Sequence, residues 1–163
     1  MSPLEKISSY NLFNYLFSGI LFVVFAEKFT AYTFIQRDIV LGLFVYYFIG
    51  LVISRFGSLV LEPLFRACGV VRFAPYKDFV RASKDDAQIA VLSEANNMYR
   101  TLCAVVVAVG LVRIYQAIDQ KFKFDPHRSM LFVGALLLIT FIFSYRKQTA
   151  YITQRIRASE RAK

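Results

Sequence analysis

Apolar residues gather in four long blocks along the chain, and charged residues separate the blocks. The blocks cover residues 12–34, 39–61, 101–118 and 130–145. A helix needs about 20 mainly apolar residues to cross a hydrocarbon core that is ~30 Å thick. The first two blocks reach that length, and the last two have flanking residues suited to the membrane interface. The pattern predicts an all-α polytopic membrane protein with four transmembrane helices.

The composition favours the same class and gives no sign of catalysis. Hydrophobic residues make up 57% of the chain, with a net charge of +9 and no tryptophan. The two cysteines, Cys68 and Cys103, and the single His127 lack the spacing of a metal site. No glycine-rich phosphate loop or nucleophile motif occurs. We therefore expect no enzyme activity, no catalytic residues, no metal and no cofactor.

The distribution of lysine and arginine predicts the topology, because positive charge marks the cytoplasmic side of a membrane. An even number of helices places both termini on the same side as the segment between the second and third blocks. That segment and the tail hold most of the positive charge, at Arg66, Arg72, Lys77, Arg81, Lys84, Arg100, Arg146, Lys147, Arg155, Arg157, Arg161 and Lys163. We predict that both termini and this segment lie in the cytosol.

Local signals predict where several helices begin and end. Asp38 precedes the second block and is suited to cap its helix. Asp125 and Pro126 open the fourth helix, because proline is tolerated in a first helical turn. Pro63 follows the second block, where we expect a sharp bend.

The third and fourth helices are predicted to extend beyond the bilayer into the cytosol. Residues 85–118 contain no proline and only one glycine, Gly110. An unbroken helix there would be ~50 Å long at about 1.5 Å per residue. The basic tail after Tyr145 either lies on anionic lipid or joins a cytosolic bundle of helical stems. The chain then divides into residues 1–65 with two transmembrane helices, a linker at 66–84, and residues 85–163 with the two extended helices.

The linker alternates aromatic and cationic residues. Phe73, Tyr76 and Phe79 alternate with Arg72, Lys77 and Arg81. Aromatic and cationic side chains together can stack bases and hold phosphates. The same pattern is typical of an amphipathic segment on a membrane surface. Both interpretations remain open at this point.

Small residues and two isolated charges lie within the apolar blocks. Gly50 and Ser54, and likewise Ala104 and Ala108, are spaced for close helix contact, and suit a bundle that continues across subunits. Glu27 and Arg113 have opposite signs and are expected at similar depth in the outer leaflet. They are candidates for an intramembrane charge pair or a charged ring in an oligomer. The alternatives are a purely structural pair, or two side chains that reach the interface separately.

Two short segments carry a resemblance to known proteins. The segments are Tyr76-Lys77-Asp78-Phe79 and residues 92–100, LSEANNMYR. They resemble segments of a group of small bacterial membrane proteins, and the layout of the chain resembles four-helix membrane effectors of anti-phage systems such as Hailong. In those systems a cytosolic nucleotide signal is thought to control an oligomeric membrane channel. The resemblance implies a homo-oligomer in the bacterial inner membrane.

These observations lead to one functional hypothesis and one alternative. The hypothesis is an oligomeric, channel-like effector in anti-phage defence, controlled by an anionic cytosolic ligand such as an oligonucleotide or nucleotide. The predicted ligand-binding residues form a basic cytosolic face at Arg72, Lys77, Arg81, Lys84, Arg146, Lys147, Arg155 and Arg157. The alternative is a non-conducting membrane scaffold that anchors a cytosolic protein partner. Membrane lipid is a partner under either interpretation.

Overall fold

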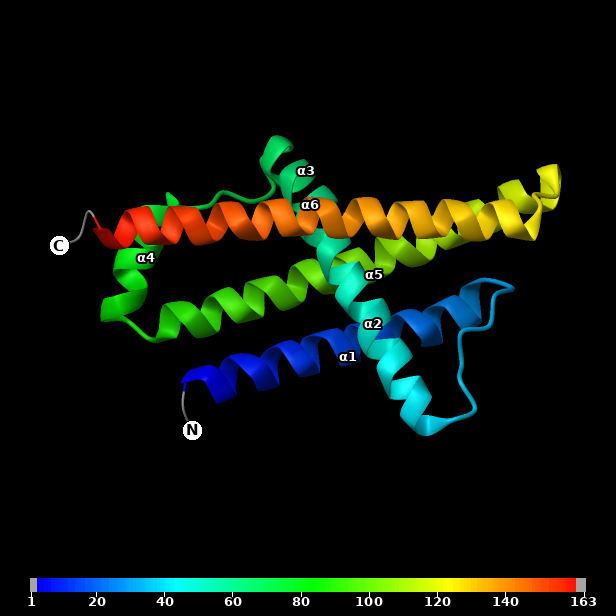
Figure 1. Ribbon diagram of the computed structural model, residues 1–163, viewed down its shortest axis with the longest axis horizontal. Helices are drawn as coiled ribbons and strands as arrows, with labels where there is room; N and C mark the ends of the chain where they lie inside the picture. The colour runs from blue at the N-terminus through cyan, green and yellow to red at the C-terminus, as the bar shows by residue number, and fades with distance from the viewer. Residues whose placement is uncertain (1–2, 161–163) are drawn as a thin grey trace.

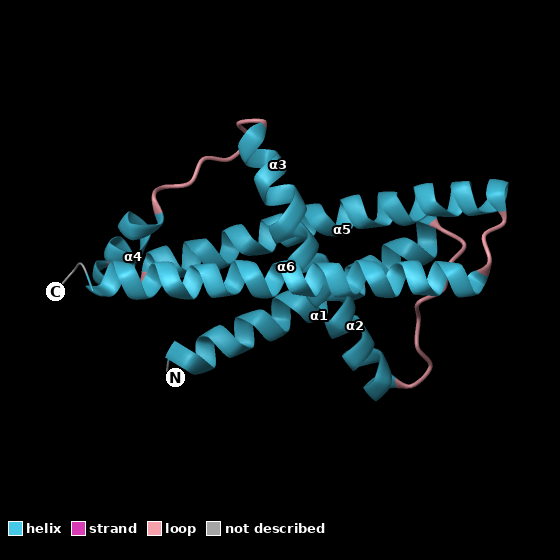
Figure 2. Cartoon of the chain, turned by 45° about the horizontal axis from the view of Figure 1, so that its top comes forward, coloured by secondary structure: helices cyan, strands magenta, loops and turns pink. Residues whose placement is uncertain are grey.

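The structure is a computed structural model that describes the backbone of residues 3–160 and the side chains of residues 10–158. Within these residues the chain is built from helices, with no strand (Figure 2). The elements are α1 (Pro3–Phe29), α2 (Ile39–Phe56), the π-helical segment η1 (Gly57–Leu61), α3 (Glu62–Ala67), α4 (Tyr76–Asp85), α5 (Gln88–Phe122) and α6 (Pro126–Glu160). Four helices are long and apolar enough to cross a membrane, which confirms the predicted fold class.

The long helices are not all aligned. Helices α1, α5 and α6 run along the long axis of the molecule, and the continuous helix formed by α2, η1 and α3 crosses them obliquely (Figure 1). The described ends of the chain lie toward the same end of the molecule as α4 (Figure 1). An even number of spans brings the two ends together in this way.

The tightest contact is the crossing of α1 and α2, where two glycines let the backbones touch. A Cβ atom on Gly50 would lie 1.7 Å from the Tyr15 carbonyl oxygen, and one on Gly19 would lie 1.8 Å from the Tyr46 carbonyl oxygen. Ser54, one turn beyond Gly50, is also buried. The small residues predicted to pack helices are therefore used inside a single chain.

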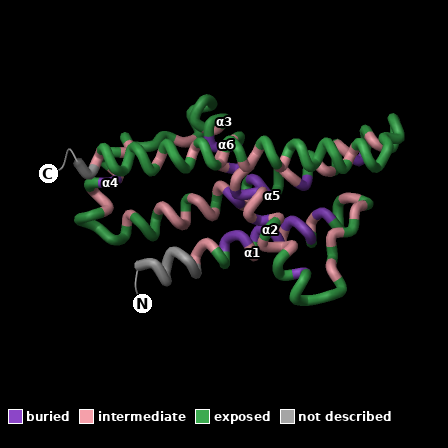
Figure 3. Tube along the Cα trace, viewed as in Figure 1, coloured by how far each residue is buried: buried purple, intermediate pink, exposed green. Residues whose placement is uncertain are grey.

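Helix α5 packs against this crossing and completes the core. Ala104 and Val105 of α5 are buried against Val23 and Ala26 of α1 and Ile53 of α2. Figure 3 shows the buried residues gathered where α1, α2 and α5 meet, whereas α6 is exposed or half-buried along its described length. The core therefore belongs to three helices, and α6 lies at its edge.

Two of the three predicted helix boundaries are confirmed. The Asp38 carboxylate accepts a hydrogen bond from the Leu41 N–H at 2.8 Å, and α6 begins at Pro126. The helix does not end at Pro63, where we expected a sharp bend, but continues to Ala67. A π-helical turn precedes the proline, in which the Glu62 N–H donates to the Gly57 carbonyl five residues back. This wider turn accommodates the residue that lacks an N–H.

The first loop begins earlier than the apolar pattern predicts. Helix α1 ends at Phe29 although the apolar block runs to residue 34. The Ala31 N–H donates to the buried Gln116 side chain of α5 at 3.0 Å, and the Gln36 N–H donates to the Tyr46 hydroxyl at 3.1 Å. These partners replace the helical hydrogen bonds, so tertiary contact ends the helix.

Helices α5 and α6 have the predicted excess length, and the segment between α3 and α5 contains a helix that was not predicted. Each long helix has 35 residues, or ~52 Å at about 1.5 Å per residue, well beyond a ~30 Å core. In the expected linker, α4 buries Val80 and half-buries Tyr76 and Phe79, while Lys77 and Arg81 are exposed. It is therefore a short amphipathic helix packed against the long ones.

Candidate functional site

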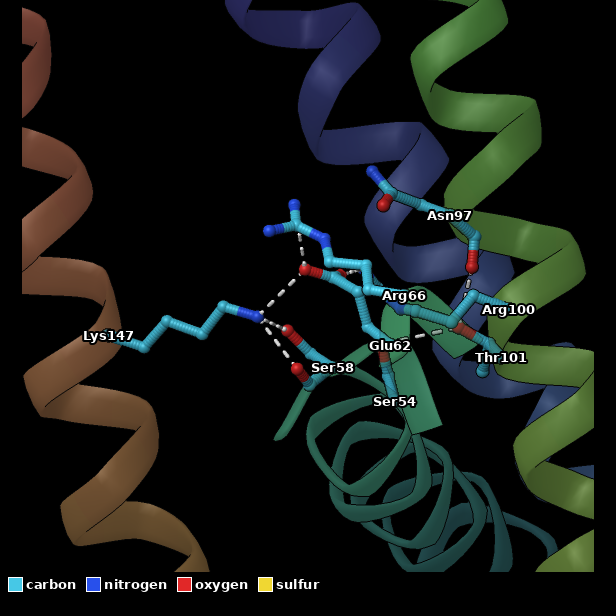
Figure 4. Close-up of polar contacts among 8 residues, drawn as sticks. All are labelled: Ser54, Ser58, Glu62, Arg66, Asn97, Arg100, Thr101 and Lys147. Atoms are coloured by element: carbon cyan, nitrogen blue, oxygen red, sulfur yellow. Dashed lines mark hydrogen bonds and ion pairs between the residues drawn. The ribbon is translucent and has the colours of Figure 1, made fainter. Parts of the chain in front are cut away.

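Three cations from three helical elements converge on Glu62. The carboxylate accepts a hydrogen bond from Arg100 Nη1 at 2.7 Å and from Lys147 Nζ at 3.2 Å, and Arg66 Nη2 lies 3.7 Å away (Figure 4). Glu62 itself is 7% exposed. We call Ser58, Glu62, Arg66, Arg100 and Lys147 the Glu62 cluster.

The Glu62 cluster lies where the apolar parts of three helices end. Glu62 directly follows the block at residues 39–61, Arg100 directly precedes the block at 101–118, and Lys147 follows the block at 130–145. Charged residues in these positions reach the interface, where charge costs less than at the bilayer centre. The cluster therefore lies at one end of the apolar spans, where a membrane interface is expected.

The π-helical turn explains why Lys147 binds here. Lys147 Nζ donates to the Ser58 carbonyl oxygen at 2.7 Å and to Ser58 Oγ at 2.9 Å, as Figure 4 shows. In an α-helix that carbonyl would accept from the Glu62 N–H, which here donates to Gly57. Pro63, the next residue, has no N–H. The Ser58 carbonyl is thus left for a side-chain donor from α6.

A buried polar layer lies beside the Glu62 cluster and extends into the crossing of α1 and α2. The Thr101 hydroxyl is within 3.4 Å of Ser54 Oγ and donates to the Asn97 carbonyl at 2.8 Å. Arg55 Nη2 donates to the Tyr15 hydroxyl at 2.8 Å. These bonds satisfy polar groups that would otherwise be costly to bury.

Most of the predicted basic face gathers at one end of the molecule. Helix α4 packs against the last part of α6, where the Tyr76 and Tyr151 rings lie 5.8 Å apart (Figure 1). Exposed cations on these two helices therefore share one end of the molecule. We call them the basic end, made of Lys77, Arg81 and Lys84 of α4 and Arg155 and Arg157 of α6.

Three predicted members of the basic face, Arg72, Arg146 and Lys147, lie outside the basic end. Arg72 is exposed in the loop before α4, and Arg146 is exposed on α6 beside Lys147. Lys147 is half-buried and already bound to Glu62 and Ser58. It therefore holds helices together in this structure.

Acidic residues accompany the cations on both helices of the basic end. Asp78 and Asp85 lie among the cations of α4, and Glu160 follows Arg157 by three residues in the sequence of α6. Carboxylates reduce the local potential around neighbouring cations. The net positive charge of the basic end is therefore smaller than the number of its cations.

The predicted pair of Glu27 and Arg113 does not form within the chain. Both side chains are exposed, and every ion pair among residues 10–158 involves Glu62. The prediction rested on depth alone, and the rotation of each helix about its axis turns the two side chains outward. Glu62 could have been noticed in the sequence as an acid between an apolar block and the cations that follow it, a position that it shares with Asp119.

The opposite end of the bundle is held by tyrosines. The Tyr32 hydroxyl donates to Asp119 at 3.4 Å, and the Tyr115 hydroxyl donates to Ser129 at 2.7 Å. Loss of water contact raises the pKa of the Tyr32 hydroxyl above its ordinary value, and the Asp119 carboxylate raises it further, so the group stays a donor. Tyrosine fits an interface because its ring is apolar and its hydroxyl is polar.

Within the described residues no three His, Cys, Asp or Glu side chains are grouped so that they could hold a metal ion. Cys68 and Cys103 are free and exposed. The candidate site is therefore electrostatic in character.

Comparisons of the chain with protein-family models, with curated proteins and with solved structures found no match.

Proposed function

We propose that this protein is an oligomeric effector of the bacterial inner membrane, controlled by an anionic ligand that binds the basic end. The ligand class is an oligonucleotide or nucleotide, and the membrane helices form or perturb a pore. By the positive-inside rule the basic end and both termini face the cytosol. The resemblance to four-helix effectors assigns the activity to anti-phage defence.

The observation that carries the proposal is the continuity of α6. One unbroken helix, Pro126–Glu160, contains both the exposed cations Arg155 and Arg157 and an apolar span. No residue in the most apolar stretch of that span is buried by the described chain. A ligand bound at the basic end would therefore act on a membrane helix through continuous helical backbone.

The exposed span of α6 is open to contact with lipid or with other copies of the chain. Leu131, Leu138 and Ile142 present apolar side chains outward, with exposed fractions of 65%, 62% and 55%. A single chain of this size has little interior for a conducting path, so a pore needs several copies. In an oligomer the basic ends would surround one axis and their potentials would add.

Ligand binding is tested with matched charge variants. The first variant neutralises Lys77, Arg155 and Arg157 with glutamine, and the control neutralises Lys121, Lys123 and Arg128 at the opposite end. Both remove the same charge from exposed positions. We expect the purified wild type and the control to bind a short oligonucleotide with an affinity that falls steeply with salt. The first variant should bind at least roughly tenfold more weakly.

The same experiment separates the alternatives. If the wild type binds no oligonucleotide or nucleotide at low salt, the signal-receiving role is wrong and the scaffold hypothesis replaces it. If the protein binds anionic liposomes but no oligonucleotide at any salt, the basic end is a lipid-surface segment. Equal weakening in both charge variants would show that the basic end has no special role.

Sidedness is checked by labelling cysteines from outside intact spheroplasts, in a background without Cys68 and Cys103. Lys123→Cys should be labelled and Lys77→Cys should not. The reverse pattern would place the basic end outside the cell and overturn the proposal.

A further inference from the structure

A hollow of about 280 Å³ lies between the η1–α3 segment and α6, beside the Glu62 cluster. Its polar lining comes from Ser58, Glu62, Arg66, Lys147 and Tyr151. Figure 4 shows the Arg66 and Lys147 side chains approaching the Glu62 carboxylate from different sides. Cations from two separate helices therefore face one space.

The charges around this hollow are not balanced. Two cations, Arg66 and Lys147, line it together with the Glu62 carboxylate, which leaves a formal excess of one positive charge. Arg100 pairs with Glu62 Oε2, while Lys147 and Arg66 share Oε1, with Arg66 at the longer distance of 3.7 Å. Cations that are partly removed from water are stabilised by a further anion nearby.

A second, smaller hollow adds a polar group without a partner. Its volume is about 20 Å³, and it shares Ser58, Lys147 and Tyr151 with the larger one. Ser144 lines it, and the Ser144 Oγ atom is buried with no hydrogen-bond partner among the described residues. This place on α6 therefore has hydrogen-bonding capacity that the chain itself does not use.

The position of the larger hollow restricts the kind of anion. Leu59 and Pro63 form its apolar wall, and Val60 and Leu64 next to them are exposed. The Glu62 cluster lies at the boundary of the apolar spans, at the level of lipid headgroups. Basic pockets between transmembrane helices at this level bind anionic headgroups. A ligand with a phosphate group and an apolar tail matches both the polar lining and the apolar wall of the hollow.

We propose that this hollow binds the phosphate of an anionic phospholipid. Arg66 contacts the phosphate oxygens, and the Ser58 and Tyr151 hydroxyls are placed to donate to them. The three N–H groups of Lys147 are taken up by Ser58 and Glu62, so Lys147 contributes positive charge beside the phosphate. Because Arg66 lies on α3 and Tyr151 on α6, the bound lipid fastens α6 to the rest of the bundle. The inference goes beyond the proposed function, since the soluble ligand is assigned to the basic end and this site lies at the membrane interface.

The test compares the protein in nanodiscs of pure phosphatidylcholine with nanodiscs that also contain phosphatidylglycerol. The variant is Arg66→Gln, chosen because the Arg66 side chain is 51% exposed and makes the longest contact with Glu62. The matched control is Arg128→Gln, an exposed arginine in the first turn of α6 at the other end of the molecule. Inorganic phosphate is added to the phosphatidylcholine discs as a separate arm.

We expect phosphatidylglycerol to raise the thermal unfolding midpoint of the wild type and of Arg128→Gln. Arg66→Gln should require roughly tenfold more phosphatidylglycerol for the same rise, as for a lost charged hydrogen bond. Equal stabilisation of all three proteins would show a general surface effect and overturn the site. Stabilisation by inorganic phosphate but not by phosphatidylglycerol would show that the site binds free phosphate and would contradict the proposed lipid ligand.

A folding control distinguishes a loss of lipid binding from a loss of structure. Helix content in phosphatidylcholine discs, measured by circular dichroism, should be the same for the wild type and both variants. If Arg66→Gln loses helix content, Arg66→Lys is tested in its place. Lysine keeps the positive charge but cannot make the bidentate contact that an arginine makes with phosphate. Stabilisation of Arg66→Lys should be weaker than that of the wild type. Identical curves for the two proteins would contradict an arginine contact with phosphate.

Discussion

The crossing of α1 and α2 and the attachment of α6 differ in how they hold helices together. At the crossing, Gly19 and Gly50 bring two backbones into direct contact, and no side chain separates them. Helix α6 is joined to its neighbours by the Lys147 contacts and by a few aromatic neighbours, such as Phe48 and Phe141 at 6.1 Å. The first contact is made by backbone against backbone, and the second combines polar and aromatic side-chain contacts.

This difference indicates which part of the molecule is more easily displaced. Close backbone contact tolerates almost no displacement, because well-packed regions change in discrete steps or not at all. Polar contacts at an interface can exchange one partner for another at smaller cost. The crossing is therefore the fixed base of the molecule, and α6 is the element that an anionic ligand would move.

The largest loss of stability is expected from one methyl group added at the crossing of α1 and α2. Gly50→Ala places its Cβ 1.7 Å from the Tyr15 carbonyl oxygen unless the helices separate. We expect it to lower the free energy of unfolding by about 3 kcal/mol or more. Unfolding in detergent, followed by circular dichroism, measures the change.

Gly134→Ala is the matched control on α6. A Cβ there meets no atom within 4 Å, so the substitution should be neutral or stabilise by about 0.5–1 kcal/mol through helix propensity. Equal destabilisation by both substitutions would contradict the contrast between the crossing and α6.

Removing the shared carboxylate should have the next largest effect. Glu62→Gln leaves Arg66, Arg100 and Lys147 without their counter-charge. We expect a loss of about 2–3 kcal/mol, below the range for fully buried pairs because the cations are partly solvated. The control, Glu27→Gln, changes an exposed residue and should shift stability by less than about 0.5 kcal/mol. Similar losses in both variants would mean that Glu27 has a partner in another copy.

The smallest effect is expected at the attachment of α6 itself. Lys147→Gln removes the bonds to Ser58 and Glu62, which should loosen α6 by about 1–2 kcal/mol while the crossing stays intact. Spin labels on exposed Gln154 of α6 and Val91 of α5 should report a broader distance distribution. The neighbouring exposed residue gives the control, Arg146→Gln. An unchanged distribution in Lys147→Gln would show that packing alone holds α6.

The fold was predictable from the sequence where local chemistry decides it. The Asp38 cap, the start of α6 at Pro126 and the four apolar spans follow from residue type and spacing. The continuation of the helix through Pro63 was not predictable in this way, because it depends on the π-helical turn that precedes the proline. Helix α4 was missed because its aromatic and cationic residues fit several kinds of segment equally well.

The candidate site was only partly predictable, because it depends on which helix faces meet. Lys77, Arg81, Arg155 and Arg157 were predicted to belong to one basic face, and the helices that carry them, α4 and the last part of α6, pack together at one end of the molecule. Lys147 was grouped with them by sequence, but its rotation on α6 turns it toward Ser58 and Glu62. Rotation about a helix axis is set by tertiary packing, which residue spacing alone does not fix.

Ion conductance across a planar bilayer that holds the purified protein tests whether the basic end controls the membrane helices. A short oligonucleotide is added to the side that carries the basic end. We predict that conductance changes for the wild type and for the Lys121, Lys123 and Arg128 control, and that the change disappears when Lys77, Arg155 and Arg157 are neutralised. Conductance that never responds to the oligonucleotide, or that responds equally in both variants, would contradict control of the membrane helices through the basic end.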